Sequence, residues 1–222
     1  MLELLPFDPH QALKFTLILL KGAVMTVQIT AGALVVAIVI GLVMAIIKTS
    51  RFWVGRFLVN IYIEIFRDVP ALTLLFILYF GLAYVGFKID PVSAAIIGLG
   101  TIGGAILTEV FRSGFDALHY GQREAALSVG MTPSMAMRYI LFPQAIRIVL
   151  PPVGNYAIGL LKDTAIVSAI AAPEIMFWAR NLVTSTFETT LIYVIAASLY
   201  FCMSFPLAQI VNKLEEKRRS WQ

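Results

Sequence analysis

The chain has 222 residues, of which 59% are apolar and only 14% are charged, and its net charge is +4. Soluble domains carry roughly 45–50% apolar and about 25% charged residues. This composition therefore excludes a water-soluble globule and a disordered chain. A disulfide scaffold is excluded because Cys202 is the only cysteine. The remaining class is an all-α integral membrane protein, and we expect a single membrane domain over residues 1–222.

Five apolar segments are predicted to cross the membrane as helices, since about 20 residues span roughly 30 Å of hydrocarbon. In chain order they are residues 22–47, 69–87, 91–111, 143–162 and 189–212. The fourth is unusual because Lys162 and Asp163 interrupt its apolar sequence. We expect this helix to end or bend near Lys162. Broken helices at membrane depth are tolerated only against protein or a water-filled cavity, so this segment is predicted to lie on a transport route.

The positions of the cationic residues predict the orientation of the spans. The first connection, the third connection and the C-terminal tail together carry 12 of the 17 Lys and Arg residues. Loops rich in Lys and Arg stay in the cytosol. We therefore predict five spans, with the N-terminus outside and the C-terminus cytosolic. Membrane topology explains the basic charge, so nucleic-acid binding is not expected.

The longest polar insertion covers residues 112–142 and contains a helix–stop–helix pattern. Residues 124–129 favour a helix, and Gly130 can supply the left-handed residue that ends it. Thr132 can cap the next helix, with Pro133 at its first position. From these residues alone, an amphipathic helix resting on the membrane face is an equally good interpretation.

The spacing within this insertion resembles a known family. Glu124-Ala125-Ala126, followed by Gly130 and Pro143, is similar to the "EAA" loop of permease subunits of bacterial ABC importers. Other stretches resemble the branch of that family that takes up polar amino acids, namely residues 62–70, 109–114, 121–126, 143–147 and 161–164. Phe142 stands where the consensus has Leu, and Ala165-Ile166 where Ser-Leu is usual.

This resemblance implies the fold of a type I ABC importer permease in the bacterial cytoplasmic (inner) membrane. It also implies a second permease copy or a homologous permease, two ATPase subunits, and an extracytoplasmic binding protein that delivers a polar amino acid. The chain lacks a phosphate-binding Gly-x-x-x-x-Gly-Lys-Ser/Thr loop. We therefore expect no enzyme activity and no cofactor in this chain, with ATP and Mg bound by the partner ATPase. The predicted ATPase-coupling residues are Gly121, Gln122, Arg123, Glu124, Ala125, Ala126 and Gly130.

Polar side chains within the predicted spans are candidates for the substrate pathway, because ionised groups at membrane depth usually face a cavity or the protein interior. Lys162 and Asp163 are the leading pair, since they can meet the carboxylate and the ammonium of an amino acid. An equally good interpretation is that they cap a helix break at the outer surface. The full candidate set is Glu109, Asn155, Lys162, Asp163, Thr164 and Ser168. For Glu109, an ion pair with Arg112 is the stronger interpretation.

Three other interpretations of the function are weaker. An ion-gradient-driven secondary transporter would show inverted repeats, and none is found. An intramembrane enzyme lacks a nucleophile–base set, and His10 and His119 are too distant for a metal site. A scaffold subunit without transport is the third alternative.

Glu174 is expected on the outer rim, where a binding protein would dock. The sequence leaves open which amino acid is carried and whether the dimer pairs identical chains.

Overall fold

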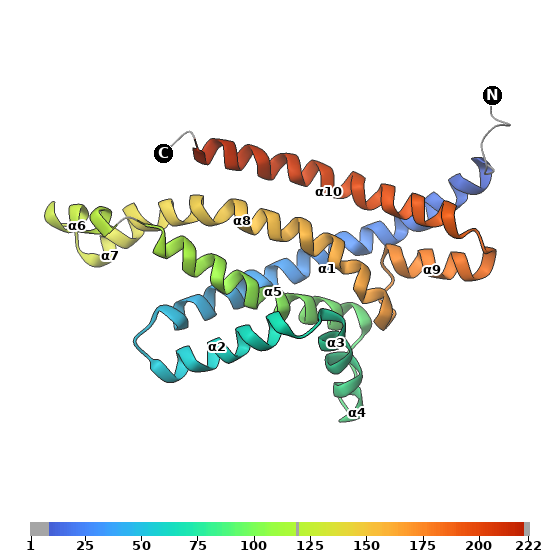
Figure 1. Cartoon of the computed structure of the whole chain (residues 1–222), viewed down its shortest axis with the longest axis horizontal. Coiled ribbons are helices and arrows are strands. Elements are labelled where there is room, and N and C mark those ends of the chain that lie inside the picture. The colour runs from blue at the N-terminus through green and yellow to red at the C-terminus, as the bar shows by residue number, and fades with distance from the viewer. Residues whose placement is uncertain (1–8, 119, 220–222) are drawn as a thin grey trace.

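The computed structural model describes residues 9–118 and 120–219, and all regular elements among them are helices. Figure 1 shows an elongated bundle in which α6 and α7 form one end, while α9 and the start of α1 lie towards the other. The α-helices are α1 Pro9–Thr49, α2 Trp53–Asp68, α3 Ala71–Phe76, α4 Leu82–Tyr84, α5 Pro91–Asp116, α6 Tyr120–Ser128, α7 Pro133–Ala136, α8 Phe142–Asp163, α9 Ile175–Thr186 and α10 Thr189–Arg219. Shorter π-helical or 3₁₀ segments are η2 Ile77–Gly81, η3 Met137–Leu141 and η4 Thr164–Ile170.

Three described helices, α1, α5 and α10, are long and apolar enough to cross a membrane. A fourth candidate span is the pair formed by α2 and residues 71–84, which are bent by 108° relative to each other. Helix α8 contains Pro151 and Pro152 and is not among these spans. The predicted segments 22–47, 69–87, 91–111, 143–162 and 189–212 each coincide largely with helix. The five-span count and the orientation stay predictions.

Helix α1 begins at Pro9, well before the predicted span at residue 22. Phe15 and Leu19 of this extension are buried in a cluster with Ile175 and Ala179 of α9 and Ile192 of α10. The apolar run alone does not reveal this extension, because Lys14 and Lys21 interrupt it. Packing against α9 and α10 therefore explains why the helix continues.

Helix α2 occupies residues that the sequence assigns to a polar connection. Gly55, Val59 and Ile63 are its buried residues, spaced four apart on one face. The opposite face exposes large apolar side chains, among them Trp53 and Phe57. Helix α2 therefore packs on the bundle through one face and leaves apolar side chains uncovered on the other.

The centre of the bundle is the contact between α1 and α5. A Cβ on Gly100 of α5 would lie 2.6 Å from the Val36 side chain of α1, and one on Gly104 would lie 2.5 Å from Ile40. Real side chains do not fit at such distances, so glycine permits the two helices to approach closely. Asp90 caps the start of α5 by accepting hydrogen bonds from the Val92 and Ser93 amides.

Candidate functional site

The predicted coupling residues lie on and directly after α6, and the local structure agrees with the sequence pattern. Helix α6 ends at Ser128, and Gly130 follows with a left-handed φ of 87°. The Gly130 amide donates to the Leu127 carbonyl, which closes the turn. Thr132 then accepts from the Met135 amide at 3.3 Å and caps α7, with Pro133 at the first position. The predicted helix, stop and restart are confirmed.

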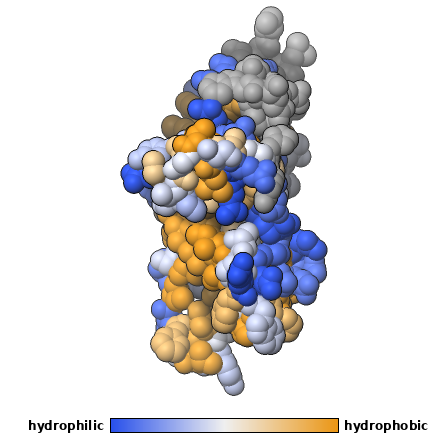
Figure 2. Space-filling view, turned by 90° about the vertical axis from the view of Figure 1, so that its left-hand side faces the viewer, coloured by the Kyte–Doolittle hydropathy of each residue, from blue (hydrophilic) through white to orange (hydrophobic). Residues whose placement is uncertain are grey.

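Most of α6 is open to its surroundings. Gly121, Gln122, Arg123, Glu124 and Ala125 are all exposed, whereas the Ala126 side chain is buried. Val129, just after the helix, has 79% of its surface exposed. Seen from the α6–α7 end, the surface combines hydrophilic and hydrophobic patches (Figure 2). The small side chain of Ala125 leaves room for another surface to approach α6 closely.

Helix α6 lies between α5 and α8 in the chain and packs against α7 and η3. Helix α5 ends at Asp116, close before α6 in the chain, and η3 leads from α7 directly into α8. The Gln144 amide of α8 donates to Gln122 of α6 at 3.5 Å, a long hydrogen bond. The segments that join α6 to α5 and to α8 are therefore short.

A charged network joins the neighbouring ends of α1 and α5. Glu109 accepts from Arg112 Nε at 2.9 Å through one oxygen and pairs with Lys48 of α1 through the other. Arg112 also pairs with Asp116. The expected ion pair of Glu109 and Arg112 is confirmed, and Lys48 is a partner that sequence spacing does not indicate. These pairs tie α1 to the helix end that leads into α6.

The predicted break in the fourth segment is present at the expected place. Helix α8 ends at Asp163, and the chain continues as the 3₁₀ helix η4 from Thr164. Lys162 and Asp163 are exposed, whereas Thr164 is fully buried and its hydroxyl donates to the Leu161 carbonyl at 2.7 Å. The Ser168 hydroxyl donates to the Ala165 carbonyl. The break thus brings two exposed charges next to a buried hydroxyl.

Asn155 and Glu109 lie apart from this break. The Asn155 amide donates to Glu215 of α10 at 3.0 Å, and Glu109 is engaged with Lys48 and Arg112. Of the six predicted pathway residues, the structure brings together only the four between Lys162 and Ser168. The places of Asn155 and Glu109 in a pathway stay predictions.

The sequence patterns did not indicate two tyrosines whose hydroxyl groups lie between helices. Tyr156 lies two helical turns before Asp163 on α8. A Cβ on Gly103 of α5 would lie 2.0 Å from the Tyr156 hydroxyl, so this glycine makes room for it. The Tyr62 hydroxyl of α2 donates to the Thr101 carbonyl of α5. The seven-residue spacing could have indicated Tyr156, but no local signal places Tyr62 against α5.

The structure corrects the expected position of Glu174. It was expected on the outer rim, but its side chain is fully buried. It caps α9 by accepting from the Met176 and Phe177 amides. The rim position is wrong because α1 and α10 cover this connection, which no local pattern predicts.

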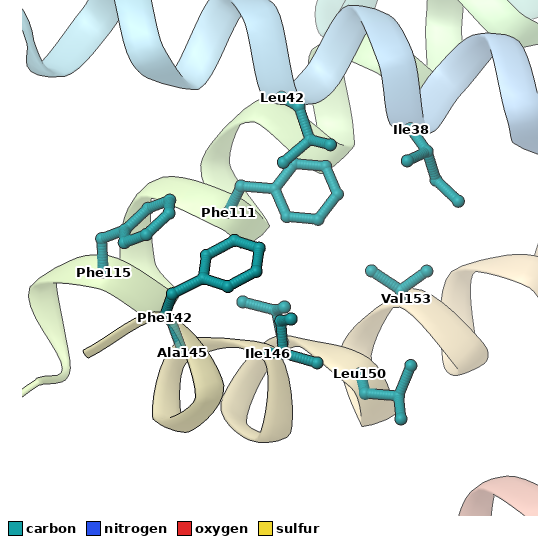
Figure 3. A pocket seen from close by; sticks show the side chains of 10 residues that line it. Ile38, Leu42, Phe111, Phe115, Phe142, Ala145, Ile146, Leu150 and Val153 are labelled. Atoms are coloured by element: carbon teal, nitrogen blue, oxygen red, sulfur yellow. The ribbon is translucent and has the colours of Figure 1, made fainter. Parts of the chain in front are cut away.

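An apolar cavity of about 270 Å³ lies between α1, α5 and α8 (Figure 3). Ile38 and Leu42 line it from α1, Phe111 from α5, and Phe142 and Val153 from α8. It contains no polar lining group, so it offers nothing to hold a charged substrate. In the described part of the chain, no cluster of three His, Cys, Asp or Glu side chains could hold a metal. His119 lies outside the described residues.

Comparison with known protein families identifies the family of this chain. Residues 37–220 match the family described as "Binding-protein-dependent transport system inner membrane component". The chain belongs to this family. It is an inner-membrane permease subunit of an ABC importer, and the matched region contains the α6 loop and the break after α8.

Relatives of this permease are similar over nearly their whole length. The probable amino-acid ABC transporter permease YckA of Bacillus subtilis is 33% identical, with 95% of this chain and 93% of the relative covered. The glutamine transport system permease GlnP of Escherichia coli is 30% identical, with 91% and 93% covered. These comparisons give no support to the ion-gradient-driven alternative.

Solved structures show the same fold. The crystal structure of an amino acid ABC transporter with histidines matches this permease with a TM-score of 0.88 and 33% identity, covering 96% of this chain and all of that one. An inward-facing structure of the MetNI methionine ABC transporter matches with a TM-score of 0.68 at 21% identity, which shows the fold alone. The predicted type I importer permease fold is confirmed.

Proposed function

We propose that this permease forms half of the pathway of an importer for polar amino acids and receives work from an ATPase through α6. The observation that carries the proposal is the geometry of α6, a short exposed helix that short segments join to α5 and α8 and that a left-handed glycine ends. A chain without an ATP site needs such a contact with a partner. When two ATPase subunits close, movement of α6 tilts the attached helices between inward-open and outward-open states.

The proposed partners follow from this role. Two ATPase subunits bind ATP and Mg, a second permease copy or a homologous permease completes the pathway, and an extracytoplasmic binding protein delivers the amino acid. The names of the relatives support an amino acid as substrate, since they are amino-acid and glutamine permeases. No cofactor is proposed for this chain.

The proposed substrate route passes the break after α8. Lys162 and Asp163 are exposed there, and Tyr156 stands on the face of α8 that leads to Asp163. An amino acid carries an ammonium and a carboxylate, which Asp163 and Lys162 can pair by charge-assisted hydrogen bonds. Thr164 and Ser168 add hydroxyl groups next to this pair.

The coupling role is tested by placing an arginine on α6. The permease is reconstituted in proteoliposomes with its ATPase and binding protein, and ATP-driven uptake of labelled glutamine is measured. Ala125→Arg is expected to abolish uptake, because a long cationic side chain replaces a small one at the proposed contact. Ala125→Ser, which keeps a small side chain at the same position, is the matched control and retains uptake. Wild-type uptake by Ala125→Arg would remove α6 from this role.

The substrate route is tested in the same vesicles. Thr164→Val with Ser168→Val, and separately Asp163→Asn, are expected to raise the amino acid concentration that gives half-maximal uptake. The hydrogen bonds removed are each worth about 1 kcal/mol net, or roughly fivefold in affinity. An unchanged substrate dependence in both variants would refute the route.

A further inference from the structure

The connection between η4 and α9 contains a buried polar cluster that neither coupling nor substrate binding explains. Glu174 is fully buried, and both of its carboxylate oxygens accept hydrogen bonds. One oxygen accepts from the Phe177 amide at 2.8 Å. The other accepts from the Met176 amide at 2.9 Å and from the Tyr200 hydroxyl of α10 at 2.6 Å. Three donors thus surround one buried carboxylate.

The same cluster reaches α1. Thr26 of α1 is fully buried, and its hydroxyl accepts from the Ile175 amide at 3.4 Å. One turn earlier, a Cβ on Gly22 would lie 2.8 Å from the backbone of Glu174 and Ile175. The connection therefore lies directly against α1, with no side chain between the two backbones.

The cluster also reaches the break after α8. The 3₁₀ helix η4, which begins at the fully buried Thr164 directly after Asp163, packs against α1 and α9. Glu174 ends the same connection and accepts from the Tyr200 hydroxyl of α10. The break is therefore joined to α10 through η4 and Glu174.

Capping of α9 does not require this arrangement. Ser, Thr, Asp or Asn caps a helix with a shorter side chain, and the Tyr200 hydroxyl contributes nothing to the cap. What Tyr200 adds is a link to α10, the candidate span with the smallest buried share, 11%.

We propose that the Glu174–Tyr200 hydrogen bond fixes the position of the helix break at Asp163 and Thr164 relative to α10. Tyr200 is therefore a positioning residue for transport. The inference rests on the proposed substrate route past Asp163. Tyr200 does not touch the substrate. It acts through Glu174 and the connection that begins at Thr164, so that α10 and the break move together when the helices tilt.

The position of the break is measured directly by the distance between two spin labels. Cys202 is the only cysteine of the chain, is exposed, and lies two residues after Tyr200. Ala165→Cys supplies the second label, next to Thr164. In the full complex with ATPase and binding protein, we expect one narrow distance distribution with Tyr200 and a broadened or shifted one with Tyr200→Phe. Tyr193→Phe, on the same helix and partly exposed, is the matched control and keeps the narrow distribution.

Transport is measured on the same substitutions without the spin labels. We expect Tyr200→Phe to lower the amino acid taken up per ATP hydrolysed by roughly tenfold or more, since it removes a hydrogen bond to a charged group. Thermal stability of the complex is recorded in parallel. Glu174→Gln, which still caps α9 and can bond Tyr200, is expected to retain more uptake than Tyr200→Phe.

Several outcomes overturn the inference. It fails if Tyr200→Phe keeps the narrow distance distribution, or if the distribution broadens while uptake per ATP matches that of Tyr193→Phe. It also fails if uptake falls only in proportion to the fraction of unfolded complex. Failure of the substrate route is read separately, from an unchanged half-saturating concentration in Asp163→Asn, a variant that leaves Tyr200 in place.

Discussion

Two connections interrupt the helices of this permease, and they differ in what covers them. The loop of α6 and α7 stands at one end of the bundle, with Glu124, Ala125 and Val129 exposed. The connection from Thr164 to Glu174 lies inside the bundle, with both of these residues fully buried. The first leaves its side chains free for a partner, whereas the second satisfies its polar groups within the chain. An exposed helix break therefore offers its side chains to a partner, whereas a buried helix break uses them for contacts within the chain.

The largest expected effect comes from filling the space beside the buried connection. Gly22→Ala places a Cβ 2.8 Å from the backbone of Glu174 and Ile175, which cannot move aside as a flexible side chain can. Overpacking of this kind costs about 1–3 kcal/mol. We expect a clear drop in the thermal unfolding temperature of the purified permease in detergent.

Gly159→Ala is the matched control for that substitution. Nothing lies within 4 Å of a Cβ at Gly159, which is helical. Replacing a helical glycine in open space is expected to stabilise by about 0.5–1 kcal/mol. Equal unfolding temperatures for the two variants would show that the connection is not tightly packed against α1.

The exposed connection is tested at its left-handed glycine. Gly130 has a φ of 87° and open space around it, so a substitution there acts through the backbone and not through a clash. A β-branched residue disfavours this conformation by roughly 1–2 kcal/mol. We expect Gly130→Val to separate ATP hydrolysis from uptake in proteoliposomes. Gly130→Asn, whose side chain tolerates the left-handed region, should keep most uptake, and wild-type uptake by the Val variant would contradict the prediction.

A smaller effect is expected at the charges that tie α1 to the exposed end. Glu109→Gln removes the ion pairs with Lys48 and Arg112, whose side chains are 21% and 37% exposed. Pairs this close to the surface contribute up to about 1 kcal/mol and are screened by salt. The difference in unfolding temperature between the variant and the wild type should shrink in roughly 1 M salt. A difference that salt leaves unchanged would point to a packing role.

The smallest effect is expected at the cap of α5. Hydrogen bonds from Ser93 hold the pKa of the Asp90 carboxyl below its usual value. The charged cap therefore stabilises the fold above the pKa of the unfolded chain, and this contribution is lost as the pH falls through the lower pKa of the folded state. Asp90→Asn keeps a capping side chain but cannot titrate. We expect the protection of the amides at the start of α5, measured relative to their intrinsic exchange rates, to fall at acid pH in the wild type and to stay constant in Asp90→Asn. An unchanged acid dependence of this protection in Asp90→Asn would assign it to another group.

The local patterns of the sequence were sufficient for much of this protein. The helix stop at Gly130, the Thr132 cap and the end of α8 at Asp163 each depend on residues within a few positions of one another. The pair of Glu109 and Arg112 lies within one helical turn. The apolar runs place most of the helices, because burial in lipid requires long uninterrupted apolar segments.

Contacts between distant segments were decided only by the tertiary structure. The burial of Glu174 depends on Tyr200 of α10 and on Thr26 and Gly22 of α1. The pairing of Lys48 with Glu109 and the seat of the Tyr62 hydroxyl against α5 are likewise contacts across more than 30 positions of the chain. A sequence records which residues can bond or pack, but not which helices meet, because that depends on how all apolar faces are covered at once.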